Sequence, residues 1–205
     1  MGPRFTTGVD RLDRELDGGI PAGSVVALSA PPASQSERLL YEIAAQRRTL
    51  YVTTERAAGA VERALRESVS PGSVEVCEVG GGDPLTDLVR AVRALNERTL
   101  VVVDPVAPLE RTPNYRAALT ELRSLLRGKD AAAVLHCVDG RAVPDGRDAT
   151  EYMADVIFDL AVDVHRNQLR TRLTVPKLRG GDAPRDALRL DFKRRVTVDN
   201  SRDIA

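Results

Sequence analysis

The stretch Ser24 to Tyr41, SVVALSAPPASQSERLLY, decides the fold of this chain. Residues Ser24 to Ser29 are almost continuously apolar, which is typical of a strand that is buried on both faces. A short turn rich in proline, alanine and serine follows. From Ser36 to Arg47 apolar residues recur at helical spacing, at Leu39, Leu40, Ile43 and Ala44. The stretch therefore predicts a buried strand, a tight loop and a helix.

This order of elements is also that of a phosphate-binding loop, whose pattern is G-x-x-x-x-G-K-[ST]. The eight positions of the pattern are filled here by Ala30, Pro31, Pro32, Ala33, Ser34, Gln35, Ser36 and Glu37. Ala30 and Gln35 replace the glycines that let the backbone wrap a phosphate. Ser36 replaces the lysine that reaches the β- and γ-phosphates, and Glu37 replaces the hydroxyl that holds Mg²⁺.

These replacements weaken nucleotide binding in two ways. The attraction of the lysine is lost, and Glu37 adds a repulsion of roughly 4 kcal/mol for unit charges about 4 Å apart at an effective dielectric of about 20. A micromolar ligand is bound by only about 8 kcal/mol. We therefore predict a degenerate nucleotide site and expect neither ATP nor magnesium as a cofactor. The residues of this site are Ala30, Ala33, Ser34, Gln35, Ser36, Glu37 and Asp104.

The same residues also allow an interpretation without any nucleotide ancestry. In that case the stretch is an ordinary strand, turn and helix. Ser34 or Ser36 would be the N-cap, and Glu37 would favour the first helical turn. The flanking sequence argues against this alternative.

That flanking sequence resembles a known family. Thr7 to Ser24 reads TGVDRLDRELDGGIPAGS, which is similar to the pattern TGI-x-x-LD-x-L-x-GGIP-x-GS that opens the RadA/KaiC branch of the RecA-like ATPases. Further along, Leu50 to Glu55 resembles the second core strand of that family, and Leu100 to Asp104 resembles its Walker B strand. Pro176 to Gly180 resembles its K-x-R-G segment. The resemblance covers nearly the whole chain.

The resemblance implies roles for four residues. Glu55 would be the carboxylate that activates water, and Asp104 would be an outer-sphere ligand of Mg²⁺. Lys177 and Arg179 would point at ATP in a neighbouring subunit. These residues are kept while the phosphate grip is lost, which favours a non-catalytic pseudo-ATPase that regulates or scaffolds a protein partner. That partner would be a second copy of the chain or an active paralogue. The structural alternative is that Asp104 caps a strand end and Glu55 caps the following helix.

Two further functions stay open. Glu55 and Asp104 also fit a divergent ATP-binding protein or ATPase in which Glu37 binds Mg²⁺ directly. The family likeness and a basic C-terminal region fit a protein that is associated with DNA in recombination or repair. Between Arg166 and Arg195 the sequence holds ten basic and three acidic residues.

This basic surplus has three interpretations. Arginines can protect an exposed sheet edge from aggregation. A basic edge can meet the acidic body of a neighbouring subunit, or it can contact nucleic acid. Aromatic residues for stacking are almost absent from the region, which argues against single-strand binding, and the whole chain is neutral with a pI of about 6.8.

The whole pattern predicts an α/β fold of the RecA-like P-loop NTPase type, with a doubly wound, mainly parallel sheet and an antiparallel C-terminal β edge. Expected strands are 24–29, 50–53, 74–79, 100–104 and 131–138, and then the pairs 156–165 with 169–176 and 188–192 with 195–198. Expected helices are 9–16, 36–47, 58–69, 84–95, 113–127 and 151–155, with Asp83 or Thr112 before a proline at two starts and Gly128 as a stop.

We expect a single domain over residues 1–205. It comprises a leading segment 1–23, an α/β core 24–155, a C-terminal β edge 156–198 and a tail 199–205 that frays. With 42% hydrophobic residues the chain can bury a substantial core, which the 3% aromatic content makes aliphatic. The loop 140–150 sets Arg141 and Arg147 against two aspartates, and we expect it to be solvated rather than bound to DNA.

The sequence also bears on location and on the cysteines. Nothing resembles a signal peptide or approaches 18 consecutive apolar residues, so we expect a cytoplasmic protein without a membrane contact. Cys77 and Cys137 are then expected to be reduced core thiols. His136 and Cys137 are neighbours on one strand and should face opposite ways, which leaves no spacing for a metal site.

Overall fold

The structure is a computed structural model that describes residues 2–70, 72–165, 167–193 and 195–199. Its strands are β1 (Arg4–Phe5), β2 (Ile20–Pro21), β3 (Val25–Ala30), β4 (Thr49–Thr53), β5 (Val74–Glu78), β6 (Leu100–Asp104), β7 (Ala132–Val138), β8 (Val156–His165), β9 (Gln168–Leu178), β10 (Leu188–Asp191) and β11 (Thr197–Val198). Its helices are α1 (Asp10–Glu15), α2 (Ser36–Ala45), α3 (Ala58–Ser68), α4 (Pro84–Ala94), α5 (Ala107–Glu110), α6 (Tyr115–Gly128) and α7 (Arg147–Met153).

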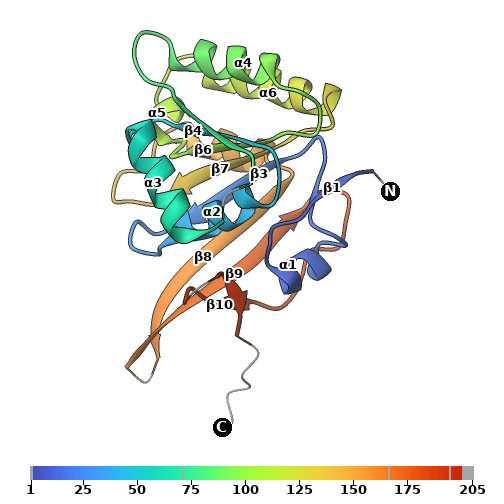
Figure 1. Ribbon diagram of the computed structural model, residues 1–205, viewed down its shortest axis with the longest axis vertical. Helices are drawn as coiled ribbons and strands as arrows, with labels where there is room; N and C mark the ends of the chain where they lie inside the picture. Colours follow the sequence, from blue (N-terminus) through green and yellow to red (C-terminus); the bar gives the residue numbers. More distant parts are fainter. Residues whose placement is uncertain (1, 71, 166, 194, 200–205) are drawn as a thin grey trace.

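The centre of the molecule is one large sheet in the strand order β11-β10-β9-β8-β3-β7-β6-β4-β5. The strands from β8 to β5 in this order run parallel, whereas β8, β9, β10 and β11 pair antiparallel. Helices cover both faces of the sheet (Figure 1). The predicted doubly wound, mainly parallel fold with an antiparallel C-terminal edge is therefore confirmed.

Strand β3 separates two hydrophobic cores, because successive side chains on a strand point to opposite faces. Val26 and Leu28 belong to the core with α2 and α3, whereas Val25 and Ala27 belong to the core with α4 and α6. Figure 1 shows α4 and α6 lying together at the top of the view, on the side of the sheet away from α2. Both faces of β3 are completely buried, as its apolar run predicted.

The leading segment closes the first of these cores. Its short strands β1 and β2 pair antiparallel, and α1 lies between them in the chain. Phe5, Leu12 and Ile20 are 1% exposed or less and pack in the core with α2 and α3. Fully burying one such side chain stabilises a protein by about 1.5–3 kcal/mol, so this segment is part of the folded unit.

Two helix starts differ from the expected ones. Helix α6 begins at Tyr115 instead of Pro113, because Asn114 takes a left-handed conformation with a φ of 65° that asparagine tolerates. The residues before it form α5, which the sequence analysis missed, and Thr112 donates its hydroxyl to the carbonyl of Leu109 at 2.6 Å to close that turn. Gly128 lies inside α6 and not after it.

Helix α7 begins at Arg147 instead of Glu151, so the expected solvated loop 140–150 is partly helical. Arg147 is only 3% exposed, because its guanidinium pairs with the carboxylates of Glu110 and Asp139. The prediction that this arginine faces solvent is wrong. The sequence shows acidic neighbours at 145 and 148, but the true partners come from distant parts of the chain.

The cysteines are free, but only Cys137 is a core thiol. Cys77 is half-buried, because β5 is the edge strand of the sheet. The expected turn between β8 and β9 includes residue 166, which lies outside the described residues, as does the tail beyond residue 199. Among the described residues, none of the helices is both long and apolar enough to cross a membrane.

Candidate functional site

The loop between β3 and α2 contains one residue in the left-handed conformation, directly before the helix. Gln35 has a φ of 56° and a ψ of 29°, which is the left-handed region, whereas Ala30 stays in β3. A left-handed conformation costs a residue with a side chain about 1–2 kcal/mol. Gln35 is also the N-cap of α2 and makes no side-chain cap, and Ser34 instead donates to the carbonyl of Pro31 at 2.7 Å. Neither serine therefore caps this helix.

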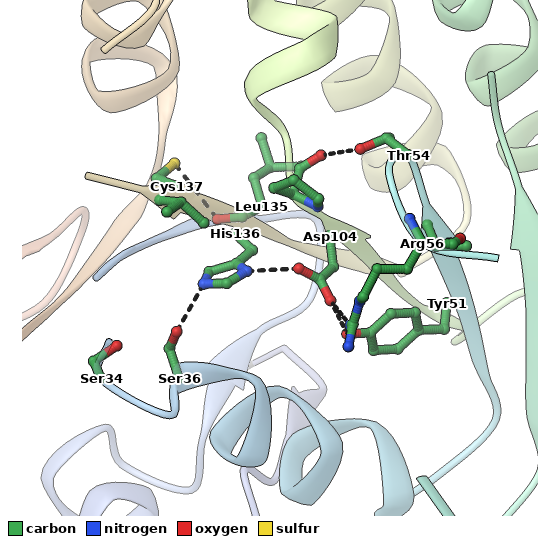
Figure 2. A network of polar contacts seen from close by, with 12 residues as sticks. Ser34, Ser36, Tyr51, Thr54, Arg56, Asp104, Leu135, His136 and Cys137 are labelled. Carbon is green, nitrogen blue, oxygen red and sulfur yellow. Dashed lines mark hydrogen bonds and ion pairs between the residues drawn. The ribbon is translucent and has the colours of Figure 1, made fainter. Parts of the chain in front are cut away.

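Ser36 opens a chain of buried hydrogen bonds at the carboxyl edge of the parallel strands. Its Oγ lies 2.9 Å from Nε2 of His136, on β7. Nδ1 of the same ring lies 2.6 Å from Oδ1 of Asp104, at the end of β6. Figure 2 shows the three side chains in line, with the imidazole between the hydroxyl and the carboxylate. All three residues are 5% exposed or less.

The second oxygen of Asp104 is also occupied. Tyr51, on β4, donates its hydroxyl to Oδ2, and the guanidinium of Arg56, from the loop after β4, forms an ion pair with the same atom (Figure 2). Arg56 further donates to the hydroxyl of Tyr41 on α2 at 2.9 Å. The carboxylate therefore receives partners on both oxygens.

This arrangement determines which groups are charged. Burial alone would raise the pKa of Asp104, but the hydrogen bonds from His136 and Tyr51 and the charge of Arg56 outweigh it, and the net pKa lies below the ordinary value. Burial raises the pKa of Tyr51 well above its ordinary value, and the adjacent Asp104 adds to the effect. Burial likewise works to lower the pKa of Arg56, but Asp104 and Tyr41 raise it overall. The ionised pair of Asp104 and Arg56 is thus the stable state.

The ionised carboxylate also fixes the tautomer of His136. Oδ1 of Asp104 can only accept, so Nδ1 carries the proton and donates it. In the neutral ring Nε2 is then a hydrogen-bond acceptor, and the hydroxyl of Ser36 donates to it. The proton of Ser36 therefore points at a basic nitrogen.

These residues do not fit a magnesium-bound triphosphate as they are arranged. Asp104 would be expected to face the hydrated ion, yet both of its oxygens are engaged with protein groups. The guanidinium of Arg56 already neutralises the charge of this carboxylate, as a bound cation would. Glu37, in the first turn of α2, adds negative charge and lies half-buried near the hydroxyl of Tyr41, whose pKa is raised mainly by burial.

The other expected site residues lie apart from this network. Glu55 is exposed in the loop after β4, and its carboxylate makes no hydrogen bond with the described residues. It does not cap α3, whose N-cap is Ala57. Strand β4 therefore ends with the acid facing solvent and with its neighbour Arg56 turned inward.

Lys177 and Arg179, at the end of β9, contact helix α7 of their own chain. Nζ of Lys177 donates to the carbonyls of Glu151 and Tyr152 at 2.8 and 2.9 Å. Nε of Arg179 lies 3.0 Å from the carboxylate of Asp155, and its Nη2 donates to the carbonyl of Ala154 at 3.3 Å. Cations favour the carboxyl end of a helix, so the pair stabilises α7. Burial and the adjacent Arg179 lower the pKa of Lys177.

A second network of buried polar residues contacts the end of β7, the strand that carries His136. Nε of Arg147 lies 3.0 Å from Oε1 of Glu110, and Thr150 donates to the same oxygen at 2.6 Å. Arg147 also pairs with Asp139, which accepts from Ser29 on β3. This network joins α5, α7 and the ends of β3 and β7. Because β7 also carries His136, the second network supports the first.

Sequence reasoning missed Tyr51, Arg56 and His136 as members of the site. His136 carried a usable signal, since it is the one histidine in the strand AAVLHCV and lies near the same end as the aspartate of LVVVD. Because parallel strands present their carboxyl ends at one edge, such residues meet when the strands are neighbours. Strands β6 and β7 do pair in parallel.

A family model covers almost the whole chain. The model described as "Family of unknown function (DUF7125)" matches residues 4–205. The chain belongs to this family. Within it, this DUF7125 chain is a RecA-like protein of the RadA/KaiC branch, as the sequence resemblance implied.

Relatives and a solved structure support that placement. The chain is 31% identical over 175 residues to the DNA repair protein RadA of Mycobacterium tuberculosis, which covers 77% of this chain and 36% of the relative. It is 30% identical over 183 residues to the DNA repair protein RadA of Mycolicibacterium smegmatis, which covers 78% and 38%. The DUF7125 chain thus spans little more than a third of the length of these relatives.

The fold is shared with a KaiC-like protein of solved structure. The KaiC-like protein PH0186 from Pyrococcus horikoshii OT3 superposes with a TM-score of 0.80 at 15% identity, covering 97% of this chain and 99% of the other. At that identity the likeness concerns the fold. It places the DUF7125 chain in the same architecture over its whole length.

Proposed function

We propose that the protein is a non-catalytic RadA/KaiC-like pseudo-ATPase that acts as a regulatory or scaffolding partner of another protein, either a second copy or an active relative. One observation carries the proposal: both oxygens of Asp104 are engaged by Arg56, Tyr51 and His136. The residue that the family resemblance assigns to magnesium serves here as the hub of an internal network. Its protein partners hold the strand ends in place, where an active relative would have a magnesium nucleotide.

The energetic comparison supports this role. Freeing Asp104 for a hydrated metal ion requires Arg56 to leave an ion pair whose carboxylate is buried and whose guanidinium is partly exposed, and a hydrogen bond to a charged group contributes about 1.5–3 kcal/mol. A micromolar ligand supplies only about 8 kcal/mol in total. The loop also lacks the lysine whose attraction to the phosphates would offset this loss, and Glu37 would repel the phosphates.

The first test is calorimetric titration of the chain with millimolar Mg-ATP, beside a thermal-shift measurement. We expect neither saturable heat nor a shift in the melting temperature. Saturable binding tighter than about 100 µM, which corresponds to more than about 5 kcal/mol, would contradict the proposal. Arg56→Ala is the informative variant, because it removes the cation from Oδ2 of Asp104 and leaves only the neutral hydroxyl of Tyr51 on that atom, and a gain of magnesium-dependent binding would identify the ion pair as the barrier.

The partner role is tested by adding the chain to an active RadA-type ATPase. We expect the ATPase rate of that relative to change and Arg179→Ala to reduce the effect. Arg66→Ala is the matched control, since Arg66 is similarly exposed on α3 and its ion pair, among the described residues, is with Glu62 on its own helix. An unchanged ATPase rate, or an equal loss in both variants, would oppose a role for the β9 pair.

A divergent ATPase is the second candidate, and the exposed carboxylate of Glu55 favours it. This side chain makes no hydrogen bond or ion pair with the residues that the structure describes, and it follows β4, where the family resemblance puts the water-activating acid. If the chain hydrolyses ATP, turnover must fall in Glu55→Gln. A wild-type rate equal to that of the variant would exclude this candidate.

Association with DNA rests on the curated relatives, which are named DNA repair proteins, and on the basic strand β9. Arg147 contributes nothing to it, because its guanidinium is buried in the protein. Binding through phosphates would weaken steeply as salt rises. Retention of a labelled oligonucleotide at low salt, lost between about 50 and 200 mM salt, would support the DNA candidate.

A further inference from the structure

We propose that Ser36, His136 and Asp104 form a working nucleophilic triad, with Ser36 as the nucleophile toward small, uncharged carboxylic esters. This activity goes beyond the partner role proposed above and depends on neither ATP nor a partner. The triad lies in the loop that would hold phosphates in an active relative.

The distances are those that nucleophilic catalysis requires. A nucleophile and its base must lie within about 2.6–3.2 Å of one another, and a third group must orient the base. Oγ of Ser36 lies 2.9 Å from Nε2 of His136, and Nδ1 lies 2.6 Å from Asp104. A triad is recognised by this geometry and not by a sequence position.

The placement of the three groups in the fold is also suitable. Ser36 follows β3 at the first turn of a helix, and His136 and Asp104 come from β7 and β6, which are the next two strands in the sheet. The chain order is serine, aspartate, histidine, which is the order found in α/β-hydrolases. Gln35 supplies the sharp left-handed turn between strand and helix that aims the hydroxyl at the strand ends.

Backbone donors are available for the charge that develops during acyl transfer. The N–H groups of Ser36 and Glu37 lie in the first turn of α2 and have no acceptor among the described residues. Free N–H groups at a helix start can stabilise an oxyanion next to the nucleophile. The carboxylate of Glu37 disfavours an anionic substrate at the same place, which selects for an uncharged ester.

The reaction follows from the tautomer described above. The Oγ of Ser36 attacks the carbonyl carbon of the ester while its proton passes to Nε2 of His136. The bond between that carbon and the alkoxy oxygen then breaks, and the leaving alkoxide takes the proton from the imidazolium as the alcohol. Water, with His136 as its base, releases the acyl group from Ser36 as a carboxylic acid and restores the hydroxyl.

The remaining contacts of Asp104 make it a positioning residue. Tyr51 and Arg56 hold Oδ2, so the carboxylate cannot rotate away and Oδ1 keeps the imidazole in the required tautomer. The charge of Arg56 reduces how strongly Asp104 can stabilise an imidazolium. Ser36 is 4% exposed, which favours a small acyl group.

The test uses the full chain with p-nitrophenyl acetate and a small alkyl fluorophosphonate. We expect release of p-nitrophenol above the buffer rate and one covalent adduct per chain, located by peptide mass mapping on Ser36. His136→Gln keeps a hydrogen-bonding group of similar size but has no base, so the labelling rate should fall about 100-fold or more. Ser36→Ala should abolish the adduct.

Ser34→Ala is the matched control. Ser34 is equally buried just before Ser36, but its hydroxyl donates to the carbonyl of Pro31 and has no imidazole partner among the described side chains. Labelling should be unchanged in this variant. The proposal is overturned if the native wild-type chain carries no adduct on Ser36, which needs no variant to establish. It is equally overturned if His136→Gln reacts at the wild-type rate while its melting temperature is unchanged.

Discussion

Asp104, at the end of β6, forms an ion pair with Arg56 from the loop after β4, and these two residues join neighbouring strands at the edge where the candidate site lies. The side chain of Asp104 is 5% exposed, whereas that of Arg56 is 37% exposed. The carboxylate is therefore the buried member of the pair, and its removal has consequences that can be measured.

Asp104→Asn should lower the free energy of unfolding by about 1.5–3 kcal/mol, because the buried hydrogen bonds from His136 and Tyr51 lose their charged acceptor, whereas the partly exposed Arg56 can be solvated. Urea unfolding followed by circular dichroism measures this change. Asp87→Asn is the control, since the pair of Asp87 with Arg90 on α4 is exposed and its loss should cost less than about 1 kcal/mol. Equal losses in the two variants would show that the buried network adds no stability.

Acid should remove the same stabilisation. The pKa of Asp104 in the folded protein lies below its ordinary value, so the fold favours the ionised carboxylate. The stabilisation is complete above the ordinary pKa of about 4 and is lost as the pH falls toward the lower pKa of the folded state. The difference in free energy of unfolding between wild type and Asp104→Asn should therefore be constant near neutral pH and shrink below about pH 4. A difference that grows on acidification would reverse the sign and disprove the assignment.

The buried pair of Arg147 and Glu110 should show strong coupling. Arg147→Met leaves the carboxylate of Glu110 buried without a charge partner, and we expect a loss of about 3–5 kcal/mol. Replacing both residues, with Glu110→Leu as the second change, should cost clearly less than the sum of the single changes. A double-mutant cycle in urea measures the coupling. Strict additivity would mean that the two side chains do not interact in the folded protein.

The two thiols should differ in reactivity. Burial raises the pKa of Cys137 far more than that of half-buried Cys77, and only the thiolate reacts. Ellman's reagent should therefore modify Cys77 in the native protein and reach Cys137 only on unfolding in urea. Cys77→Ser should abolish the native reaction. Two equivalents released at the same rate from the folded wild type would contradict the burial of Cys137.

The fold could be predicted where the signal is local. The apolar run of β3 and the periodic leucines of α2 and α6 specify element type by their spacing alone, so these elements were found with small errors at their ends. The starts of α6 and α7 were displaced, because Asn114 adopts a left-handed turn and Arg147 is buried by partners far away in the chain. The residues next to Asn114 and Arg147 in the sequence indicate neither the left-handed turn nor the burial.

The site was predictable only in part for the same reason. The alignment of the loop with a phosphate-binding pattern located Ser36, and the strand LVVVD located Asp104, because both lie in recognisable local patterns. The contact between them runs through His136, which the sequence analysis interpreted only as the neighbour of Cys137. A hydrogen bond between strands that are far apart in the sequence depends on the order of strands in the sheet, and no local spacing encodes that order.

Helix α7 and a neighbouring subunit would compete for the side chains of Lys177 and Arg179. Both side chains already hold the carbonyl groups at the end of α7. A neighbouring subunit that recruits either of them must therefore release the last turn of this helix. If subunits assemble through β9, the backbone amides of residues 151–154 should therefore exchange hydrogen faster in the assembled state than in the free chain.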